Sequence, residues 1–203
     1  IPTTFYGQIP NSKSGTGTIT CDTYNGSTLI GSKSTSFTAT VSESNSKPTL
    51  NPTAVDSNAT TTALTGDSSK FVKYYSNASV ATGAQARNSA TLTSQKITCG
   101  AKSITSASGT INAVESGSFT FSATDSRGYT TTQTVNKTLI EYIKLTCSLN
   151  AGAPTTAGVA TLKISGNYWD GTFGALANTL TVQYRYKTQG GSYGSWTTVS
   201  ATK

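Results

Sequence analysis

The chain contains no histidine and no methionine, and only three of its 203 residues are cysteine. Without histidine it lacks Ser-His-Asp and Cys-His catalysis, histidine metal sites and the usual general base at neutral pH. The eight acidic residues are scattered, so no local carboxylate pair of the kind that glycosidases use is visible. These absences predict a protein that is not an enzyme and has no catalytic residue, metal ligand or cofactor.

Long apolar runs and basic runs are also missing. No stretch of eighteen apolar residues occurs, which excludes a membrane-spanning helix. The formal net charge is +7, yet no two of the fifteen lysines and arginines are adjacent. Nucleic-acid binding would require a basic run or patch interleaved with aromatic residues. We therefore predict dispersed surface charge, no membrane insertion and no nucleic-acid partner.

Serine and threonine, by contrast, make up a third of the residues, while proline is scarce. Both side chains are unfavourable in helix interiors and suit the solvent-facing side of strands. A disordered Ser/Thr-rich stalk is disfavoured because apolar residues alternate with polar ones throughout the chain. The composition therefore predicts an all-β protein with polar outer faces.

The stretch Ser118–Tyr142 shows this pattern most clearly. Phe119, Phe121 and Ala123 alternate with hydroxyl residues, which predicts one buried face of a strand. The sequence Asp125-Ser126-Arg127-Gly128 supplies turn chemistry, and a second strand follows. We interpret the stretch as a hairpin that closes an antiparallel domain. Asp125 and Arg127 belong to a structural turn, held by contact with each other or with the backbone.

Proline and turn signals divide the chain into three units. Residues 48–143 are predicted to form a complete β-sandwich, because short strands alternate there with turn signals. A strand is expected over residues 53–64. Residues 1–47 carry the strong hairpin signal Asn25-Gly26 and are too few for an independent sandwich. Residues 144–203 begin a further sandwich and also fall short of a whole one.

An aromatic cluster in residues 168–196 is the concentration that could bind a ligand. Tyr168, Trp169 and Phe173 lie in a glycine-rich loop, and aromatic rings of this kind stack on sugars. They are our candidate glycan contacts. Tyr184, Tyr186 and Trp196 are expected to fill the core of the third unit.

The cysteines and one short acidic motif have structural interpretations. Cys21, Cys99 and Cys147 each sit in a strand-like run and are expected to be small buried hydrophobes in a reducing compartment. A Cys99–Cys147 bridge is the alternative. Asp56-Ser57-Asn58 begins like a calcium loop but lacks the downstream acid, so we expect an Asx turn.

Three strings carry a resemblance to a known family. They are IPNSKSGTGTITCDTYNGSTLIGSKSTSFTATV, the SGSFTFSATDSRGYTTTQTV hairpin leading to IEY, and SGNYWDGTFGALANTLTVQYRYKTQGGSYGSW. Together they resemble minor structural tail proteins of siphophages that infect Gram-positive bacteria, streptococcal phages especially. The resemblance covers most of the chain in the same order, and its motifs are structural, including the turn at Asp125–Gly128 and the strand from Asn178 to Tyr186.

The resemblance implies tandem immunoglobulin-like or fibronectin-like antiparallel β-sandwiches in a tail tip, baseplate or fibre. Residues 1–47 are then the C-terminal part of one such domain, and residues 144–203 the N-terminal part of another. It carries over no catalytic residue. The expected partners are other tail proteins, further copies of the chain in the virion and host cell-wall polysaccharide. The expected location is the virion tail, after assembly in the host cytoplasm.

The leading functional prediction is thus a non-enzymatic tail component that acts as a spacer or scaffold and in host-surface attachment. Two alternatives stay open at this point. One is a bacterial surface adhesin or stalk of immunoglobulin-like domains, and the other is a carbohydrate-binding module. The receptor and the copy number do not follow from the sequence.

Overall fold

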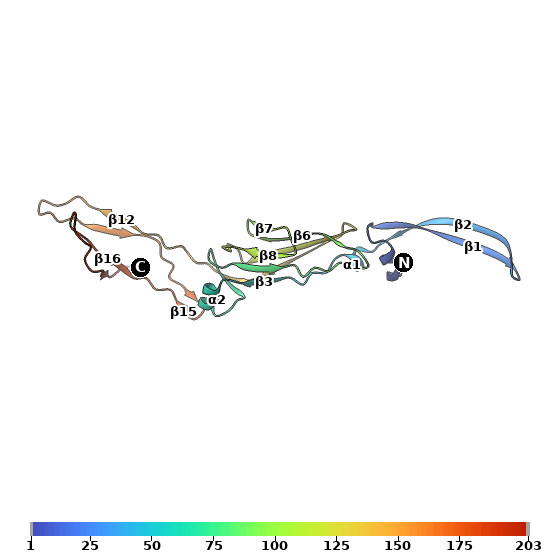
Figure 1. Cartoon of the computed structure of the whole chain (residues 1–203), viewed down its shortest axis with the longest axis horizontal. Coiled ribbons are helices and arrows are strands. Elements are labelled where there is room, and N and C mark those ends of the chain that lie inside the picture. Colours follow the sequence, from blue (N-terminus) through green and yellow to red (C-terminus); the bar gives the residue numbers. More distant parts are fainter. Residues whose placement is uncertain (1, 202–203) are drawn as a thin grey trace.

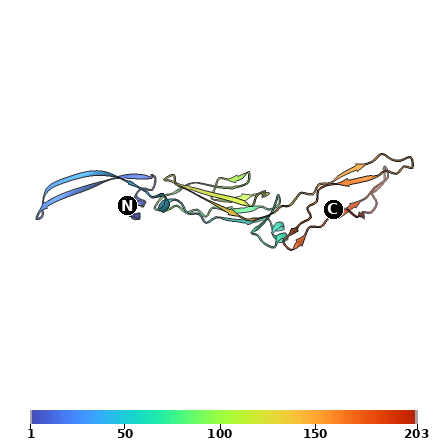
Figure 2. The same cartoon turned by 180° about the vertical axis from the view of Figure 1, so that it is seen from behind.

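A computed structural model describes residues 2–201 and shows an elongated molecule of three segments in line (Figures 1 and 2). A long hairpin forms one end, a two-layered domain the middle, and a set of small sheets the other end. We call these the N-terminal hairpin segment (residues 2–47), the central sandwich (48–143) and the C-terminal segment (144–201). No helix among these described residues is long and apolar enough to cross a membrane.

The N-terminal hairpin segment is built around two long strands. Its elements are the 3₁₀-helix η1 (Thr3–Gln8), strands β1 (Ser14–Asn25) and β2 (Thr28–Thr40), and the short helix α1 (Glu43–Ser46). The strands pair antiparallel from Ser14↔Thr40 to Asn25↔Thr28. The predicted hairpin is confirmed, although Asn25 still pairs with Thr28 and the two-residue loop is Gly26-Ser27, one residue beyond the predicted Asn25-Gly26.

The central sandwich contains two antiparallel sheets and a short parallel pair. In space the first sheet runs β10-β9-β6-β7 and the second β3-β5-β8, while β4 pairs with β11 in parallel. The elements are β3 (Thr53–Asp56), α2 (Ala59–Thr65), β4 (Lys70–Val72), β5 (Ala78–Ala81), β6 (Leu92–Cys99), β7 (Lys102–Ile104), β8 (Ser108–Ile111), β9 (Ser118–Asp125), β10 (Thr130–Asn136) and β11 (Thr138–Ile140).

The core of the sandwich receives side chains from both sheets, which makes the two layers one domain. On β9 the residues predicted to face inward are buried and their neighbours are not, so the hairpin prediction is confirmed. The rings of Phe71 and Phe119 pack with their centroids 5.3 Å apart. The buried cluster consists of Ala54, Phe71, Ala78, Val80, Ile97, Cys99, Ile111, Val114, Phe119 and Phe121.

The predicted strand over residues 53–64 is wrong in its second half, where the chain forms helix α2. The Asn58 side chain accepts a hydrogen bond from the Thr60 amide, and Gly66 ends the helix with φ of +66°. Asparagine at the start and a glycine with positive φ at the end are the usual helix caps. The two caps and the contacts of helix α2 with the rest of the domain stabilise the helix more than the preference of its threonines for strands disfavours it.

Asp56 explains why the helix forms at that place. Its carboxylate is buried and accepts hydrogen bonds from the hydroxyls of Thr61 (2.5 Å) and Ser76 (2.6 Å) and from the amides of Asn58 and Asn77. The bond from the Asn58 amide is the predicted Asx turn. Because four protein donors surround the carboxylate, Asp56 has a structural role. The described residues contain no group of three or more potential metal ligands.

The C-terminal segment consists of three two-stranded sheets. They pair β12 (Ser148–Ala151) with β13 (Leu162–Ser165), β14 (Thr172–Phe173) with β15 (Leu176–Ala177), and β16 (Val182–Tyr184) with β17 (Thr197–Val199). Tyr184, Tyr186 and Trp196 are exposed, so the expectation that they fill a core is wrong for the residues described.

The three cysteines are free thiols, and Cys99 and Cys147 are not bridged. Only Cys99 is buried, as the sequence had suggested for all three, and burial raises the pKa of its thiol. Cys21, on β1, and Cys147, directly before β12, are exposed because the neighbouring two-stranded sheets have no second layer among the described residues.

We predict that Phe121→Ala lowers the free energy of unfolding of the central sandwich by about 3–5 kcal/mol, because it leaves a cavity in a close-packed core. Urea unfolding followed by far-UV circular dichroism measures the change. Thr132→Ala, at an exposed position on the neighbouring strand β10, is the matched control and should change stability by less than about 0.5 kcal/mol. Equal effects of the two variants would contradict this assignment of the core.

Candidate functional site

The first candidate site is the joint between the N-terminal hairpin segment and the central sandwich, where the Arg127 guanidinium is buried. Its Nε donates to the Ile9 carbonyl (2.8 Å) and one terminal nitrogen donates to the Arg87 carbonyl (3.0 Å). The other terminal nitrogen donates to the carbonyls of Tyr6 (2.9 Å) and Asn88. One side chain thus ties residues 6–9 to the loop at residues 87–88, which belongs to the central sandwich.

Asp125 completes the environment of the guanidinium. One carboxylate oxygen lies 3.5 Å from Arg127 Nη1, and both side chains are fully buried. The other oxygen accepts hydrogen bonds from the amides of Arg127 (3.0 Å) and Tyr129 (2.9 Å), which shapes the turn between β9 and β10. A buried charge is tolerated when it is paired and hydrogen-bonded. The predicted structural contact between Asp125 and Arg127 is therefore present, with additional partners across the joint.

Neighbouring residues of the same turn make further contacts across the joint. The Ser126 hydroxyl donates to the Pro10 carbonyl (2.6 Å), and the Tyr129 hydroxyl donates to the Val41 carbonyl (2.7 Å). The rings of Tyr6 and Tyr129 pack with Val41 in a small apolar cluster, next to Ile9. The turn at Asp125–Tyr129 thus contacts both chain passes of the N-terminal segment, before and after its hairpin.

The second candidate site is the joint between the central sandwich and the C-terminal segment, and it is aromatic. The Tyr142 ring meets Tyr75 edge-on, with centroids 5.2 Å apart, and lies 5.5 Å from Trp169 and 5.9 Å from Phe173. Trp169 and Phe173 pack against each other at 4.8 Å. Aromatic pairs at these separations are favourable in tilted and edge-on arrangements.

The loop that carries these aromatic residues is fixed against helix α2. Gly174 has φ of +66°, and a side chain there would meet the Thr65 carbonyl at the end of α2. Within the loop, the Tyr168 hydroxyl donates to the Asn178 carbonyl (2.5 Å) and the Asn178 amide group donates to the Trp169 carbonyl (2.8 Å). The joint therefore depends on a glycine that permits close approach and on a hydrogen-bonded loop.

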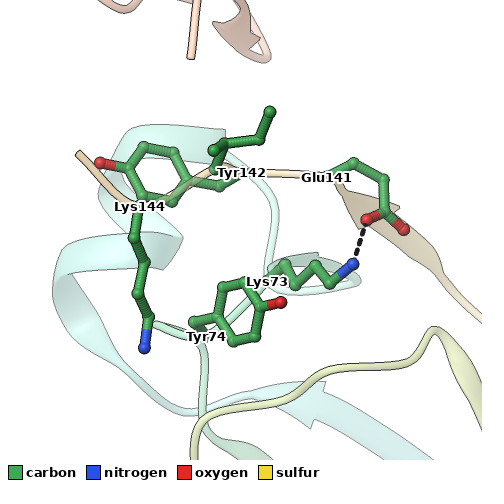
Figure 3. A pocket seen from close by; sticks show the side chains of 6 residues that line it. Lys73, Tyr74, Glu141, Tyr142 and Lys144 are labelled. Carbon is green, nitrogen blue, oxygen red and sulfur yellow. Dashed lines mark hydrogen bonds and ion pairs between the residues drawn. The ribbon is translucent and has the colours of Figure 1, made fainter. Parts of the chain in front are cut away.

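A hollow of about 540 Å³ lies beside the second joint (Figure 3). Lys73 Nζ lies 2.6 Å from Glu141, and this hydrogen bond raises the pKa of Lys73. The ammonium groups of Lys73 and Lys144 lie 5.5 Å and 4.7 Å from the centroid of the Tyr74 ring. Tyr74 has φ of +69°, an unusual conformation for a bulky residue. The hollow is lined by Lys73, Tyr74, Glu141, Tyr142, Ile143 and Lys144.

The structure brings the three candidate glycan contacts into one loop but places them differently. Phe173 is buried, whereas Tyr168 and Trp169 are partly buried. Trp169 and Phe173 contact Tyr142 of the central sandwich, a residue that the sequence-based reasoning did not select. Glycan contact by Tyr168, Trp169 and Phe173 stays a prediction, and their observed contacts are structural.

Sequence reasoning also missed the residues that line the hollow. Lys73, Tyr74, Glu141 and Lys144 come from two stretches far apart in the sequence, so no local motif marks them. The signal that could have found them is the density of tyrosine and lysine in Lys73-Tyr74-Tyr75 and Tyr142-Ile143-Lys144. The arrangement offers two ammonium groups, one carboxylate and aromatic faces, without a nucleophile–base pair among the lining residues.

The fold and the two joints define an elongated, predominantly β protein. The chain belongs to a family described as siphovirus protein of unknown function (DUF859), whose model matches residues 1–168. The match includes the N-terminal hairpin segment and the whole central sandwich. No curated protein and no solved structure matches the chain. It is therefore a siphophage protein, which supports a structural role in the phage particle and agrees with the siphophage part of the resemblance found in the sequence.

We predict that Arg127→Lys loosens the first joint by about 3 kcal/mol, since lysine cannot satisfy four carbonyls at once and leaves buried acceptors unpaired. Limited trypsin digestion measures this, because the backbone at Lys13 lies in the joint, where its carbonyl accepts a hydrogen bond from the Val41 amide (2.9 Å). Cleavage after Lys13 should become roughly a hundredfold faster when opening precedes cleavage.

Arg87→Lys is the matched control, because the exposed Arg87 contributes only its carbonyl to the joint and trypsin also cleaves after lysine. It should leave the cleavage rate after Lys13 unchanged. Equal rates for Arg127→Lys and the unmodified protein would contradict the role given to the guanidinium.

We predict that the first joint weakens in alkali through Tyr129. Burial, followed by the nearby charges of Glu43 and Asp125, raises the pKa of Tyr129 above 10.0. The neutral form is therefore favoured in the folded state, and its stabilising contribution is complete below pH 10 and is lost as pH rises further. Tyr129→Phe removes the ionisable group and one hydrogen bond.

The midpoint of urea unfolding, measured from pH 7 to pH 11, tests this. At pH 7 the free energy of unfolding of the unmodified protein should exceed that of Tyr129→Phe by about 1 kcal/mol. This difference should become smaller above pH 10. Lysines titrate in both proteins and cancel in the difference. A gap that stays constant to pH 11 would show that Tyr129 does not ionise on unfolding.

Proposed function

We propose that the protein is a non-enzymatic structural component of the siphophage tail, located in the tail tip, baseplate or fibre. It acts as a spacer or scaffold and contributes to host-surface attachment. The observation that carries this proposal is the arrangement of three segments in line, with a hydrogen-bonded joint on one side of the central sandwich and an aromatic joint on the other (Figure 1). A rod with fixed joints holds its two ends apart.

Membership of a siphovirus family supports the phage part of this proposal. The virion tail, reached after assembly in the host cytoplasm, is the proposed location. Other tail proteins and further copies of the chain are the proposed partners, without nucleic acid or membrane insertion. We also propose that the sandwich is immunoglobulin-like, which its two antiparallel sheets of short strands support.

The chemistry of the described side chains supports a role in binding or structure. The chain has no histidine, and its buried acids are engaged by protein partners: Asp56 by Thr61 and Ser76, and Asp125 by Arg127. In a surface adhesin locked by Lys–Asn isopeptide bonds, a buried acid lies beside the lysine. Here the lysine ion pairs involve the solvent-accessible acids Asp67, Glu115 and Glu141. This favours the tail component over the adhesin alternative.

Host contact is proposed to be electrostatic and to involve the hollow at the second joint. Cell walls of Gram-positive bacteria are rich in anionic polymers, and a net charge of +7 favours encounter with them. The hollow presents the Lys144 ammonium group beside the Tyr74 ring, next to the Lys73–Glu141 ion pair, a combination suited to an anionic polymer with sugar or polyol units. Weak contacts repeated over many tail copies would add up by avidity.

Immunogold labelling of purified virions with an antibody against the central sandwich tests the location. Gold particles should lie on the tail, at its tip or along a fibre. Labelling confined to the capsid, or absent from intact and disrupted particles alike, would contradict the proposal.

Pull-down with isolated cell walls of a Gram-positive host tests the contact separately. Lys144→Gln should weaken binding several-fold, and binding should fall as salt screens the charges. Lys96→Gln is the control, because this substitution removes the same charge. Lys96 is exposed on β6 and does not line the hollow. Salt-independent binding, or equal losses in both variants, would remove the hollow from the proposal.

A further inference from the structure

The hairpin β1–β2 has two chemically different faces. From Ser14 to Thr23, residues directly opposite each other share a face, and the face changes with every residue. The register shifts between Thr23 and Tyr24, so the exposed pair Tyr24↔Leu29 at the tip lies outside this pattern. One face carries hydroxyl pairs along most of its length, with hydrogen bonds between Thr20 and Ser34 (2.8 Å) and between Ser32 and Asp22 (2.5 Å). The pairs on this polar face are Ser14↔Thr40, Thr16↔Thr38, Thr18↔Ser36, Thr20↔Ser34 and Asp22↔Ser32.

The opposite face is apolar and uncovered by the described residues of the chain. The Phe37 ring lies against Gly17 and remains 42% exposed, and Ile19 is 53% exposed. The sequence places no large polar residue here except one lysine. The pairs on this apolar face are Gly15↔Ala39, Gly17↔Phe37, Ile19↔Thr35, Cys21↔Lys33 and Thr23↔Gly31.

The apolar face continues the core of the first joint. Ile9, which packs against the cluster of Tyr6, Val41 and Tyr129, also covers Gly15 at the base of the hairpin. Ala39, opposite Gly15, is buried there, and the next pair along the strands is exposed. An apolar layer thus begins inside the molecule and runs outward along the hairpin without a covering layer. Its continuation points to a protein partner that supplies the second layer.

The stability expected of the hairpin β1–β2 also indicates a partner that covers one face. A two-stranded hairpin is marginal in water unless one face packs on another element. Here twelve pairs extend away from the sandwich with both outer edges unpaired (Figure 1). Soluble proteins usually protect such edges with prolines, several charges or a covering element. The hairpin has no proline and carries a single acid, Asp22, and a single base, Lys33.

We propose that the apolar face of β1–β2 docks against the same face of a second copy of this chain, and that two hairpins form a four-stranded, two-layered sandwich. Charge supports a second copy, because the hairpin is neutral in a chain of net charge +7, so it neither repels itself nor selects a charged partner. This inference names the surface through which the copies of the chain in the proposed function would associate. It rests on the proposed function only for the place of the dimer in the virion.

The proposed alignment has the two-fold axis parallel to the strands. Paired residues then stay at the same level, and Lys33 of one copy lies opposite Cys21 of the other. With the axis across the strands at the level of Lys33, the two ammonium groups would face each other, which is unfavourable in an apolar layer. The parallel alignment also lets the two rods extend from the shared hairpin layer toward the same end. An interface with closed two-fold symmetry uses the same patch on both copies.

Sedimentation equilibrium of the purified chain tests the proposal, since it needs no virion and its failure would leave the tail location unaffected. We expect a dimer whose dissociation constant rises by about tenfold or more in Phe37→Glu. Ser36→Glu is the matched control, because it adds the same charge at the adjacent position on the polar face, and it should leave the dimer intact. A monomer at the highest soluble concentration, or equal weakening by both variants, would overturn the proposal.

Cross-linking provides a second readout, which tests the apolar face directly. In a Cys147→Ser background, Cys21 is the exposed thiol and Cys99 is buried. A short bis-maleimide should join Cys21 of two copies in dilute solution, and this product should disappear in Phe37→Glu. Efficient cross-linking that persists in Phe37→Glu, or no cross-linking at concentrations where a dimer sediments, would show that the face is not the interface.

Discussion

The burial of the Arg127 guanidinium constrains the arrangement of the whole N-terminal half of the molecule. Its donors are satisfied by carbonyls at Tyr6 and Ile9 on one side and at Arg87 and Asn88 on the other. Removing the N-terminal segment would take away the acceptors at Tyr6 and Ile9 and uncover the ion pair of Arg127 with Asp125. The hairpin is therefore held to the sandwich by several hydrogen bonds from one side chain, and opening the joint breaks those to Tyr6 and Ile9 together.

The two joints use different chemistry, and this has consequences for a tail component. Directional hydrogen bonds at Arg127 define one orientation, whereas the aromatic contacts of Tyr142 with Trp169 and Phe173 tolerate small rotations. The first joint also starts the apolar layer that we assign to self-association, so orientation and assembly are linked there. The second joint places the cationic hollow between the sandwich and the C-terminal segment, where a host-surface contact would be presented at the side of the rod.

Alternation of apolar residues predicted β9, a run rich in threonine and β-branched residues after the turn predicted β10, and Asn25-Gly26 predicted the first hairpin. All three signals are local. Helix α2 was missed because threonine favours strands, and its formation depends on Asp56, which needs Ser76 and Asn77 from a distant stretch. The partners of Arg127 are backbone carbonyls, which leave no trace in residue identity. For the same reason the sequence grouped Tyr168, Trp169 and Phe173 but could not reveal that Tyr142 packs against them.

The central claim is that Arg127 holds the hairpin at a fixed angle to the sandwich. Pulsed electron–electron resonance between nitroxides on Ser36→Cys and Ser103→Cys measures this directly, in a background of Cys21→Ser, Cys99→Ala and Cys147→Ser. Both labelled positions are exposed, one on the polar face of the hairpin and one on β7. At dilution, with unlabelled chain added to suppress pairs between copies, one narrow distance distribution is predicted. A broad distribution in the protein that retains Arg127 would contradict the claim.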